Sequence, residues 1–193
     1  YAVGGSPAQA VLHAILEIMP QKPDLVVSGI NYGENIGSGV TISGTVGAAM
    51  EAAALGYKAL AVSLETDQKY HLSYSREIDF SAAAQFTAKF ARLLLDKQFP
   101  EDIHLLKVEI PSDATEETPW EVSRLTHQRY YEPLKPERAS WDVATTVGYR
   151  EAARLEDEPE GTDAYVMRVR RNVAVTPLSL DMTSRVDLFD LEK

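Results

Sequence analysis

Cysteine is absent from the 193-residue sequence. This absence excludes disulfide bonds, thiolate metal sites and cysteine nucleophiles. It also favours a reducing compartment, so we expect a cytoplasmic protein. Long apolar runs are missing too, since none approaches the roughly 18 residues that a membrane-spanning helix requires. We therefore expect no association with a membrane.

Positive charge is scarce as well. The chain has 19 lysine and arginine residues against 29 aspartate and glutamate residues, a formal net charge of -10. Attraction to a nucleic acid needs the opposite sign, so we expect no polynucleotide partner, although local donors can still hold a small phosphate. The four histidines, His13, His71, His104 and His127, lack the spacing of a metal site. We interpret them as surface or core residues.

The first part of the chain alternates between strand and helix patterns. Ser6, Ser43 and Asp79 stand at helix-capping positions. Pro7 takes the first helical position after Ser6, and Gln9 completes a capping box with Ser6. Such alternation indicates parallel strands with helices on the sheet faces, which is a layered α/β domain. The expected elements are helices over residues 7–19, 43–55 and 80–95 and strands over residues 25–28, 59–64 and 103–110.

After about residue 111 the helix patterns disappear. Strand-like runs follow one another and predict antiparallel hairpins, and the last segment predicts a short helix or an arm. We therefore divide the chain into an α/β core over residues 1–111 and a part with hairpins and a C-terminal arm over residues 112–193, which completes the same domain. The strand-like runs cover residues 120–132, 141–150, 164–171 and 173–180.

A glycine-rich segment lies between the first strand and the second helix. It reads SGINYGENIGSGVTISGTVGAA and holds six glycines and two asparagines in residues 28–49. Residues 29–42 carry no pattern of a helix or strand, and so long a connection in a compact domain is usually functional. Because it leaves the carboxyl end of a strand and enters a helix, it occupies the place where ligands bind in open α/β sheets.

The helix start after this segment predicts a phosphate site. Ser43, Gly44 and Thr45 offer two hydroxyls and free backbone N–H groups. The alternative is that Ser43 merely caps the helix and Thr45 has no binding role. The G-x-G-x-x-G, G-x-x-x-x-G-K-[ST] and G-x-S-x-G motifs are absent, which disfavours dinucleotide oxidoreductases, P-loop NTPases and elbow-type serine hydrolases.

The stretch DLVVSGINYGENIGSGVTISGTVGAAMEA closely resembles the central motif of the SurE family, the metal-dependent 5′/3′-nucleotidases. GGSPAQAV is similar to the family's GTPADCV, and VTPLSLDMT to its closing T-P-L-x-x-D-x-T. The resemblance implies a Rossmann-like domain with a hairpin extension and an exchanged C-terminal arm, assembled as a homodimer or homotetramer. It also implies hydrolysis of nucleoside monophosphates with one divalent cation, Mg²⁺ or Mn²⁺.

The resemblance assigns roles to individual residues. Asn31 becomes a metal ligand and Asn35 a contact near metal and phosphate, so both count as catalytic candidates. Ser43, Gly44 and Thr45 become the phosphate-binding turn, together with Asn35. An asparagine amide oxygen suits a hard cation. Taken singly, each asparagine is equally typical of a turn.

Two family features are missing. The sequence contains neither the N-D-D-G motif, whose aspartates hold the metal, nor the later serine ligand. A lone amide cannot hold Mg²⁺ against water, and Glu34 would oppose a phosphate unless a cation lay between them. We expect the first strand and helix of the sheet to lie upstream. The alternatives are a non-catalytic phosphate-binding or assembly module, and a different α/β phosphatase or transferase.

Two further groups lie in the second part of the chain. Arg168, Arg170 and Arg171 form a basic cluster, interpreted as a solvated edge or a salt-bridging interface on a strand. The aromatic residues Tyr130, Tyr131 and Trp141 are interpreted as packing across strands, with stacking on a nucleobase as the alternative.

Overall fold

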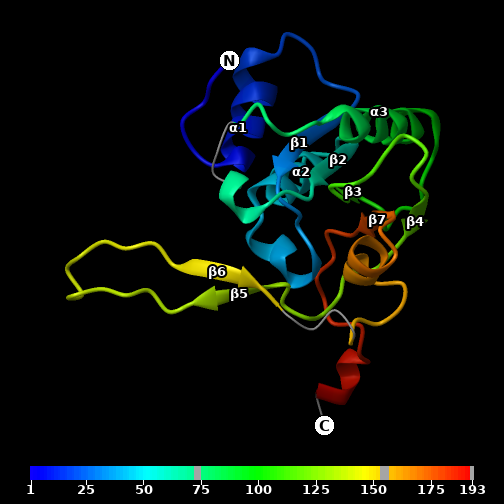
Figure 1. The fold of residues 1–193 in the computed structure, drawn as a ribbon. Coiled ribbons are helices and arrows are strands. Elements are labelled where there is room, and N and C mark those ends of the chain that lie inside the picture. Colours follow the sequence, from blue (N-terminus) through cyan, green and yellow to red (C-terminus); the bar gives the residue numbers. More distant parts are fainter. Residues whose placement is uncertain (72–74, 153–156, 192–193) are drawn as a thin grey trace.

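A mixed five-stranded sheet forms the centre of the protein (Figure 1), seen in a computed structural model that describes residues 1–71, 75–152 and 157–191. The strand order is β1-β2-β3-β7-β4. The first three strands are mutually parallel, whereas β7 runs antiparallel to β3 and parallel to β4. The strands are β1 (Val26–Tyr32), β2 (Ala59–Leu64), β3 (Leu105–Ile110), β4 (Trp120–Val122) and β7 (Val173–Leu178).

Helices cover both faces of this sheet. The α-helices are α1 (Pro7–His13), α2 (Gly44–Ala54) and α3 (Ser81–Asp96). Short helical turns cover Ala14–Ile18, Gly37–Ile42, Gln68–Tyr70, Tyr165–Val169 and Leu188–Leu191. The capping box at Ser6 and the cap at Ser43 are present as predicted. At α3 the cap residue is Phe80 instead of Asp79, whose carboxylate nevertheless accepts the N–H of Ser81 at 2.8 Å.

The alternation of side chains along the strands builds two apolar layers. Leu60 and Val62 of β2 face α3 and pack with Phe86 and Phe90. Ala59 and Ala61, one residue out of phase, face α2. These layers confirm the expected α/β class. Within the described residues, no helix is both long and apolar enough to cross a membrane; the cytoplasmic location stays a prediction.

The first strand is longer than its sequence pattern predicts. β1 continues to Tyr32, so Asn31 belongs to a strand and the expected structureless loop over residues 29–42 is wrong. A register shift between Ser28 and Asn31 interrupts the pairing with β2. Gly29 makes this possible, since its φ is 121° and a Cβ there would lie 2.3 Å from the Val62 carbonyl oxygen.

The run over residues 164–171 is expected to be a strand, but Tyr165–Val169 form a helical turn instead. The cause is local capping, because the Thr162 hydroxyl accepts the N–H of Tyr165 and the Asp163 carboxylate accepts that of Ala164. Val166 and Met167 fill the core beside it. The run over residues 173–180 does form a strand, but β7 belongs to the central sheet.

A separate hairpin projects from the core (Figure 1). Its strands, β5 (Tyr131–Leu134) and β6 (Gly148–Glu151), pair antiparallel as expected, although both are much shorter than the predicted runs. Trp141 lies in the connection between them and is 90% exposed. The chain then returns through β7 to a C-terminal segment that ends in a helical turn away from the sheet (Figure 1).

Candidate functional site

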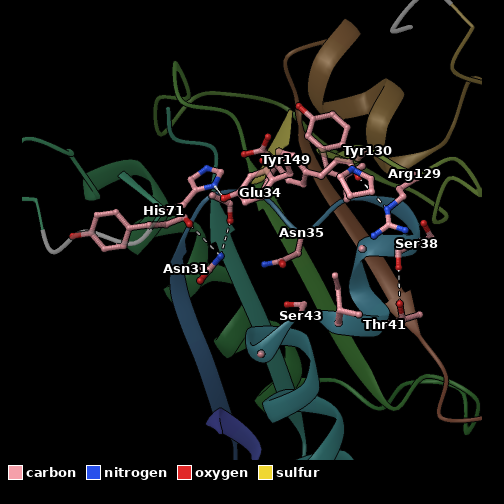
Figure 2. A pocket seen from close by; sticks show the side chains of 18 of the residues that line it. Asn31, Glu34, Asn35, Ser38, Thr41, Ser43, His71, Arg129, Tyr130 and Tyr149 are labelled. Atoms are coloured by element: carbon pink, nitrogen blue, oxygen red, sulfur yellow. Dashed lines mark hydrogen bonds between the residues drawn. The ribbon is translucent and has the colours of Figure 1, made fainter. Parts of the chain in front are cut away.

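A pocket of about 650 Å³ opens where the parallel strands end (Figure 2). The end of β1, the connection after it and the start of α2 form its floor, and the root of the hairpin forms a wall. The carboxyl ends of parallel strands are where ligands bind in α/β sheets, and the volume suits a small organic molecule. The sequence candidates in its lining are Asn31, Asn35, Ser43 and Gly44; Thr45 lies outside the lining.

Asn31 is held by its own backbone. Its Nδ2 donates to the carbonyl oxygen of Gly33 at 2.7 Å and to that of Tyr32 at 3.3 Å. The amide oxygen is thereby left without a partner among the described residues. Gly33 has a φ of 99°, and a Cβ there would lie 2.6 Å from His71 Nε2, so this turn depends on glycine. The geometry presents one oxygen ligand to the pocket.

Asn35 is fixed on three sides. Its backbone N–H donates to Glu109 Oε2 at 2.8 Å, and its carbonyl oxygen accepts from Lys107 Nζ at 2.9 Å. Its side-chain Nδ2 donates to Ser63 Oγ at 2.8 Å. One amide hydrogen and the amide oxygen of Asn35 therefore remain available to a ligand.

The start of α2 keeps its capping hydrogen bond. Ser43 Oγ accepts the backbone N–H of Val46 at 3.1 Å, as the capping alternative predicts. A hydroxyl that accepts one bond still has its own proton to donate. Ser43 and Gly44 both line the pocket, whereas Thr45 stands in the first turn beside it. The phosphate-binding role of this turn stays a prediction.

A buried ionic cluster lies beneath the connection after β1. Lys107 Nζ is 3.3 Å from Glu109 Oε1 and 3.0 Å from Asp163 Oδ2, and all three side chains are inaccessible to solvent. Asp163 also accepts the N–H of Gly37 at 2.9 Å. Burial raises the pKa of Glu109, although Lys107 opposes this effect. The cluster thus holds the backbone of the connection after β1 at Asn35 and Gly37.

Sequence reasoning did not identify this cluster. One signal was available: Lys107 and Glu109 alternate within an otherwise apolar strand, so they share a face of the sheet. Two charges on a buried strand face require partners. The identity of the third partner, Asp163, could not be read from spacing because it lies 56 residues further along the chain.

Glu34 is buried in the connection after β1, beside the root of the hairpin. Only 4% of the residue is exposed, and its carboxylate oxygens form no hydrogen bond of standard geometry within the described residues, although the hydroxyls of Tyr131 and Tyr130 are close enough to favour its charged form. Burial raises the pKa of Glu34. The hydroxyls of Tyr130 and Tyr131 are buried nearby, and burial together with the Glu34 charge raises their pKa values. Neither hydroxyl forms a hydrogen bond of standard geometry.

His71 lines the pocket next to the hairpin. Its Nε2 lies 3.1 Å from the Thr66 carbonyl oxygen, which can only accept, so the neutral ring carries its proton there. Its Nδ1 then accepts the Tyr149 hydroxyl at 2.8 Å. Both ring nitrogens are engaged, in keeping with the interpretation of His71 as a structural residue.

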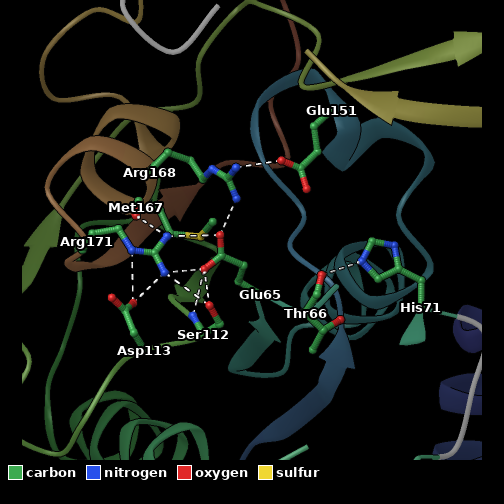
Figure 3. Close-up of polar contacts among 9 residues, drawn as sticks. All are labelled: Glu65, Thr66, His71, Ser112, Asp113, Glu151, Met167, Arg168 and Arg171. Atoms are coloured by element: carbon green, nitrogen blue, oxygen red, sulfur yellow. Dashed lines mark hydrogen bonds and ion pairs between the residues drawn. The ribbon is translucent and has the colours of Figure 1, made fainter. Parts of the chain in front are cut away.

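The arginine cluster forms ion pairs inside the chain (Figure 3). Arg171 Nη2 lies 2.6 Å from Glu65 Oε2, which also accepts the N–H of Ser112 at 2.8 Å. Arg168 pairs with Glu65 and, at 2.7 Å, with Glu151 of the hairpin. The salt-bridging interpretation is confirmed, while the placement on a strand was wrong. Through Arg168 the core holds the root of the hairpin.

The lowered pKa of Glu65 predicts that the folded protein loses stability in acid. Burial alone would raise its pKa, but the hydrogen bonds from Arg171 and Ser112 outweigh burial and lower the pKa from 4.5 to about 2. A lowered folded-state pKa stabilises the fold above pH 4.5, and this contribution is lost as pH falls through 2. Glu65→Gln is therefore expected to cost about 2 kcal/mol at pH 6, after allowance for solvent screening, and less at pH 3.

Urea denaturation at the two pH values measures this difference. Glu151→Gln is the control, because the Glu151 side chain is 43% exposed and an exposed pair contributes less than about 1 kcal/mol. An equal cost of Glu65→Gln at pH 6 and pH 3 would contradict the assignment.

A complete cation site is not formed by the described residues. None of their histidine, aspartate and glutamate side chains gather in a group of three or more that could hold a metal ion. Asn31 offers a single amide oxygen, which fits a divalent cation only as one ligand among several. The metal role of Asn31 stays a prediction.

The fold and the pocket together define a class of protein. It is a layered α/β protein whose ligand pocket lies between the carboxyl ends of parallel strands and the start of a helix, with a hairpin along one side.

Comparisons with known proteins identify the family. The family model described as survival protein SurE matches residues 1–132. A 5′-nucleotidase SurE of Thermococcus gammatolerans is 42% identical over 193 residues, covering 100% of this chain and 71% of the relative. One of Methanocella arvoryzae is 41% identical over 204 residues, covering 100% and 73%. The chain belongs to the SurE family, as its motifs predict.

A solved structure shows the same fold. The crystal structure of the SurE protein from Aquifex aeolicus matches with a TM-score of 0.74 at 31% sequence identity. The match covers 98% of this chain and 74% of that chain. The mostly parallel sheet and the separate hairpin predicted from the sequence are therefore confirmed.

Proposed function

We propose that the protein is a phosphomonoesterase that hydrolyses nucleoside 5′-monophosphates, and also 3′-monophosphates, to nucleoside and phosphate. One observation carries this proposal: Asn31, Asn35 and the amino end of α2 meet in a single pocket of a SurE-family fold. The relatives named above are 5′-nucleotidases by name.

The chain's own groups suit a phosphate. The first turn of α2 presents unpaired backbone N–H groups and a partial positive charge, and the Ser43 hydroxyl adds a donor. The free amide hydrogen of Asn35 adds another. Aimed at the equatorial oxygens, these donors offset the charge that develops when water attacks phosphorus in line with the leaving oxygen.

The charge around the pocket supports a cation in the complex. Two carboxyl groups of the buried cluster face one ammonium, and Glu34 adds a further buried carboxyl. A phosphate dianion beside them is disfavoured unless positive charge lies between. We propose one divalent cation, Mg²⁺ or Mn²⁺, with the Asn31 amide oxygen as one ligand. Because the described residues do not complete its coordination, no catalytic step is derived through it.

We also propose that the protein assembles as a homodimer or homotetramer. Trp141 in the hairpin connection and Met182 and Phe189 near the C-terminus are at least 72% exposed. Exposed apolar side chains on projecting segments gain by packing on a second copy.

Phosphate release tests the proposed function. The full-length protein is incubated with 5′-AMP, 5′-GMP and 3′-AMP, with Mg²⁺ or Mn²⁺ and with a chelator. We expect release from all three substrates with the cation and little release with the chelator. Binding of nucleotide without any release would favour the non-catalytic module instead. Release that is unchanged by the chelator would reject the cation.

A further inference from the structure

Ser63 of β2 lies at the pocket end of the sheet, between two strands that carry polar side chains. It is in register with Asn31 on β1 and with Glu109 on β3. Register partners on parallel strands present their side chains on the same face, so these three form a row beneath the connection after β1. Ser63 is only 1% exposed and lies outside the pocket lining. A contribution of Ser63 to ligand binding must therefore act through a neighbour.

That neighbour is Asn35. The backbone of Asn35 is held by Glu109, which accepts its N–H, and by Lys107, which donates to its carbonyl oxygen. Its side chain is held separately, because Asn35 Nδ2 donates to Ser63 Oγ at 2.8 Å. Ser63 thus fixes the part of Asn35 that the buried ionic cluster does not.

An asparagine amide needs such an anchor to keep one orientation. Its terminal torsion joins an sp³ carbon to an sp² carbon, and torsions of this kind have broad minima, so a fixed backbone leaves the amide plane free to rotate. The bond to Ser63 restrains this rotation and directs the amide oxygen and the second amide hydrogen of Asn35 away from the sheet. Figure 2 shows the Asn35 side chain between those of Asn31 and Ser43, which line the same pocket.

We propose that Ser63 is a positioning residue for phosphoryl transfer. Its hydroxyl holds the Asn35 amide so that the second amide hydrogen can donate to an equatorial oxygen of a phosphomonoester under attack. A donor that is oriented before the reaction stabilises the developing charge without reorganisation at the moment of reaction. This inference rests on the proposed function for the place of the phosphate.

A double-mutant cycle in the full-length protein tests the inference. Ser63→Ala keeps the Asn35 amide but releases it, so kcat for 5′-AMP should fall about tenfold while KM stays near the wild-type value. Asn35→Ala removes the donor and should lower kcat about 100-fold. The double variant should match Asn35→Ala within about twofold, because Ser63 then has no amide left to position.

Ser123→Ala is the matched control. Ser123 is also a buried serine, and its hydroxyl is likewise bonded at 2.8 Å to one side chain, that of Thr176, but it lies outside the pocket lining. The two serine variants should lower the unfolding temperature by similar small amounts, whereas Ser123→Ala should keep the wild-type kcat. An equal loss of kcat in both would mark the effect of Ser63 as general destabilisation and overturn the inference.

Orthovanadate separates the inference from the proposed function. It can adopt the five-coordinate geometry of a phosphorus atom under attack, so its binding reports on the same donor without turnover. Calorimetry should show binding weakened about tenfold by Ser63→Ala and at least as much by Asn35→Ala. The double variant should bind vanadate no more weakly than Asn35→Ala.

Each remaining outcome decides between the two proposals. If 5′-AMP is hydrolysed but Ser63→Ala matches the wild type, or the losses from Ser63→Ala and Asn35→Ala multiply, the inference fails and the proposed function stands. If no nucleotide is hydrolysed but vanadate binding depends on Ser63 through Asn35, the proposed function fails alone. Absence of both hydrolysis and vanadate binding would overturn both.

Discussion

Lys107→Met is expected to lower the free energy of unfolding by about 3–5 kcal/mol. The variant keeps most of the side-chain volume but removes the only charge opposing Glu109 and Asp163 in this cluster. Two carboxyl groups then remain buried without a cation, and Asn35 loses the donor to its carbonyl oxygen. Urea denaturation monitored by circular dichroism measures the loss.

Two further variants make this expectation specific. Lys69→Met removes a lysine whose side chain is 63% exposed and should leave the stability close to that of the wild type. The triple variant Lys107→Met, Glu109→Gln, Asp163→Asn leaves no uncompensated charge and should recover part of the loss. A cost below about 1 kcal/mol for Lys107→Met would show that the cluster does not depend on its cation.

Asn31→Ala is expected to reduce kcat/KM for 5′-AMP by about 100-fold or more in the full-length protein. The reason is the proposed role of its amide oxygen, since the loss of groups that merely orient metal ligands already costs 10- to 100-fold. Its two backbone hydrogen bonds are local, so the unfolding temperature should fall only slightly. Phosphate release at saturating Mn²⁺ and at limiting Mn²⁺ measures the effect.

The matched control is Asn172→Ala. Asn172 also donates a hydrogen bond from Nδ2, here to Glu121 at 2.5 Å, but it lies outside the pocket lining. Its activity should stay near that of the wild type. Wild-type turnover by Asn31→Ala, with wild-type dependence on Mn²⁺, would remove Asn31 from the cation site.

Local signals in the sequence determine much of the α/β core. Ser6 and Ser43 cap their helices, and the apolar runs over residues 59–64 and 103–110 become the two buried strands β2 and β3. The caps depend on contacts within three residues, and a strand that is buried on both faces appears in the sequence as an apolar run. The motifs that resemble the SurE family identified the family correctly.

Where the structure differs from the sequence prediction, contacts outside the predicted element account for the difference. β1 extends past Gly29 because β2 offers a partner beyond the register shift. Tyr165–Val169 form a helical turn because Thr162 and Asp163 cap it, although Val166 and Val169 favour strands in isolation. In the first case the structure depends on pairing with a distant strand, and in the second on a cap just outside the expected element.

The candidate site shows the same division. Asn31, Asn35 and Ser43 come from one continuous segment, and their meeting follows from the strand-to-helix order alone. The hairpin wall comes from about 100 residues further along the chain, so no spacing rule could bring Tyr130 or Tyr149 to Glu34. The sequence indicated Glu34 only as an unfavourable charge near phosphate, whereas the structure buries it against that wall.

The origin of that wall separates two tasks within the pocket. The groups proposed to handle phosphate come from the sheet edge and α2, which the core fixes in place, while the opposite side comes from the hairpin root, fastened by Arg168 to Glu151. Substitutions at the root can therefore retune which organic group is admitted without disturbing the reacting end. Related proteins with this fold can therefore differ in the organic group they accept while they keep the same phosphate-binding groups.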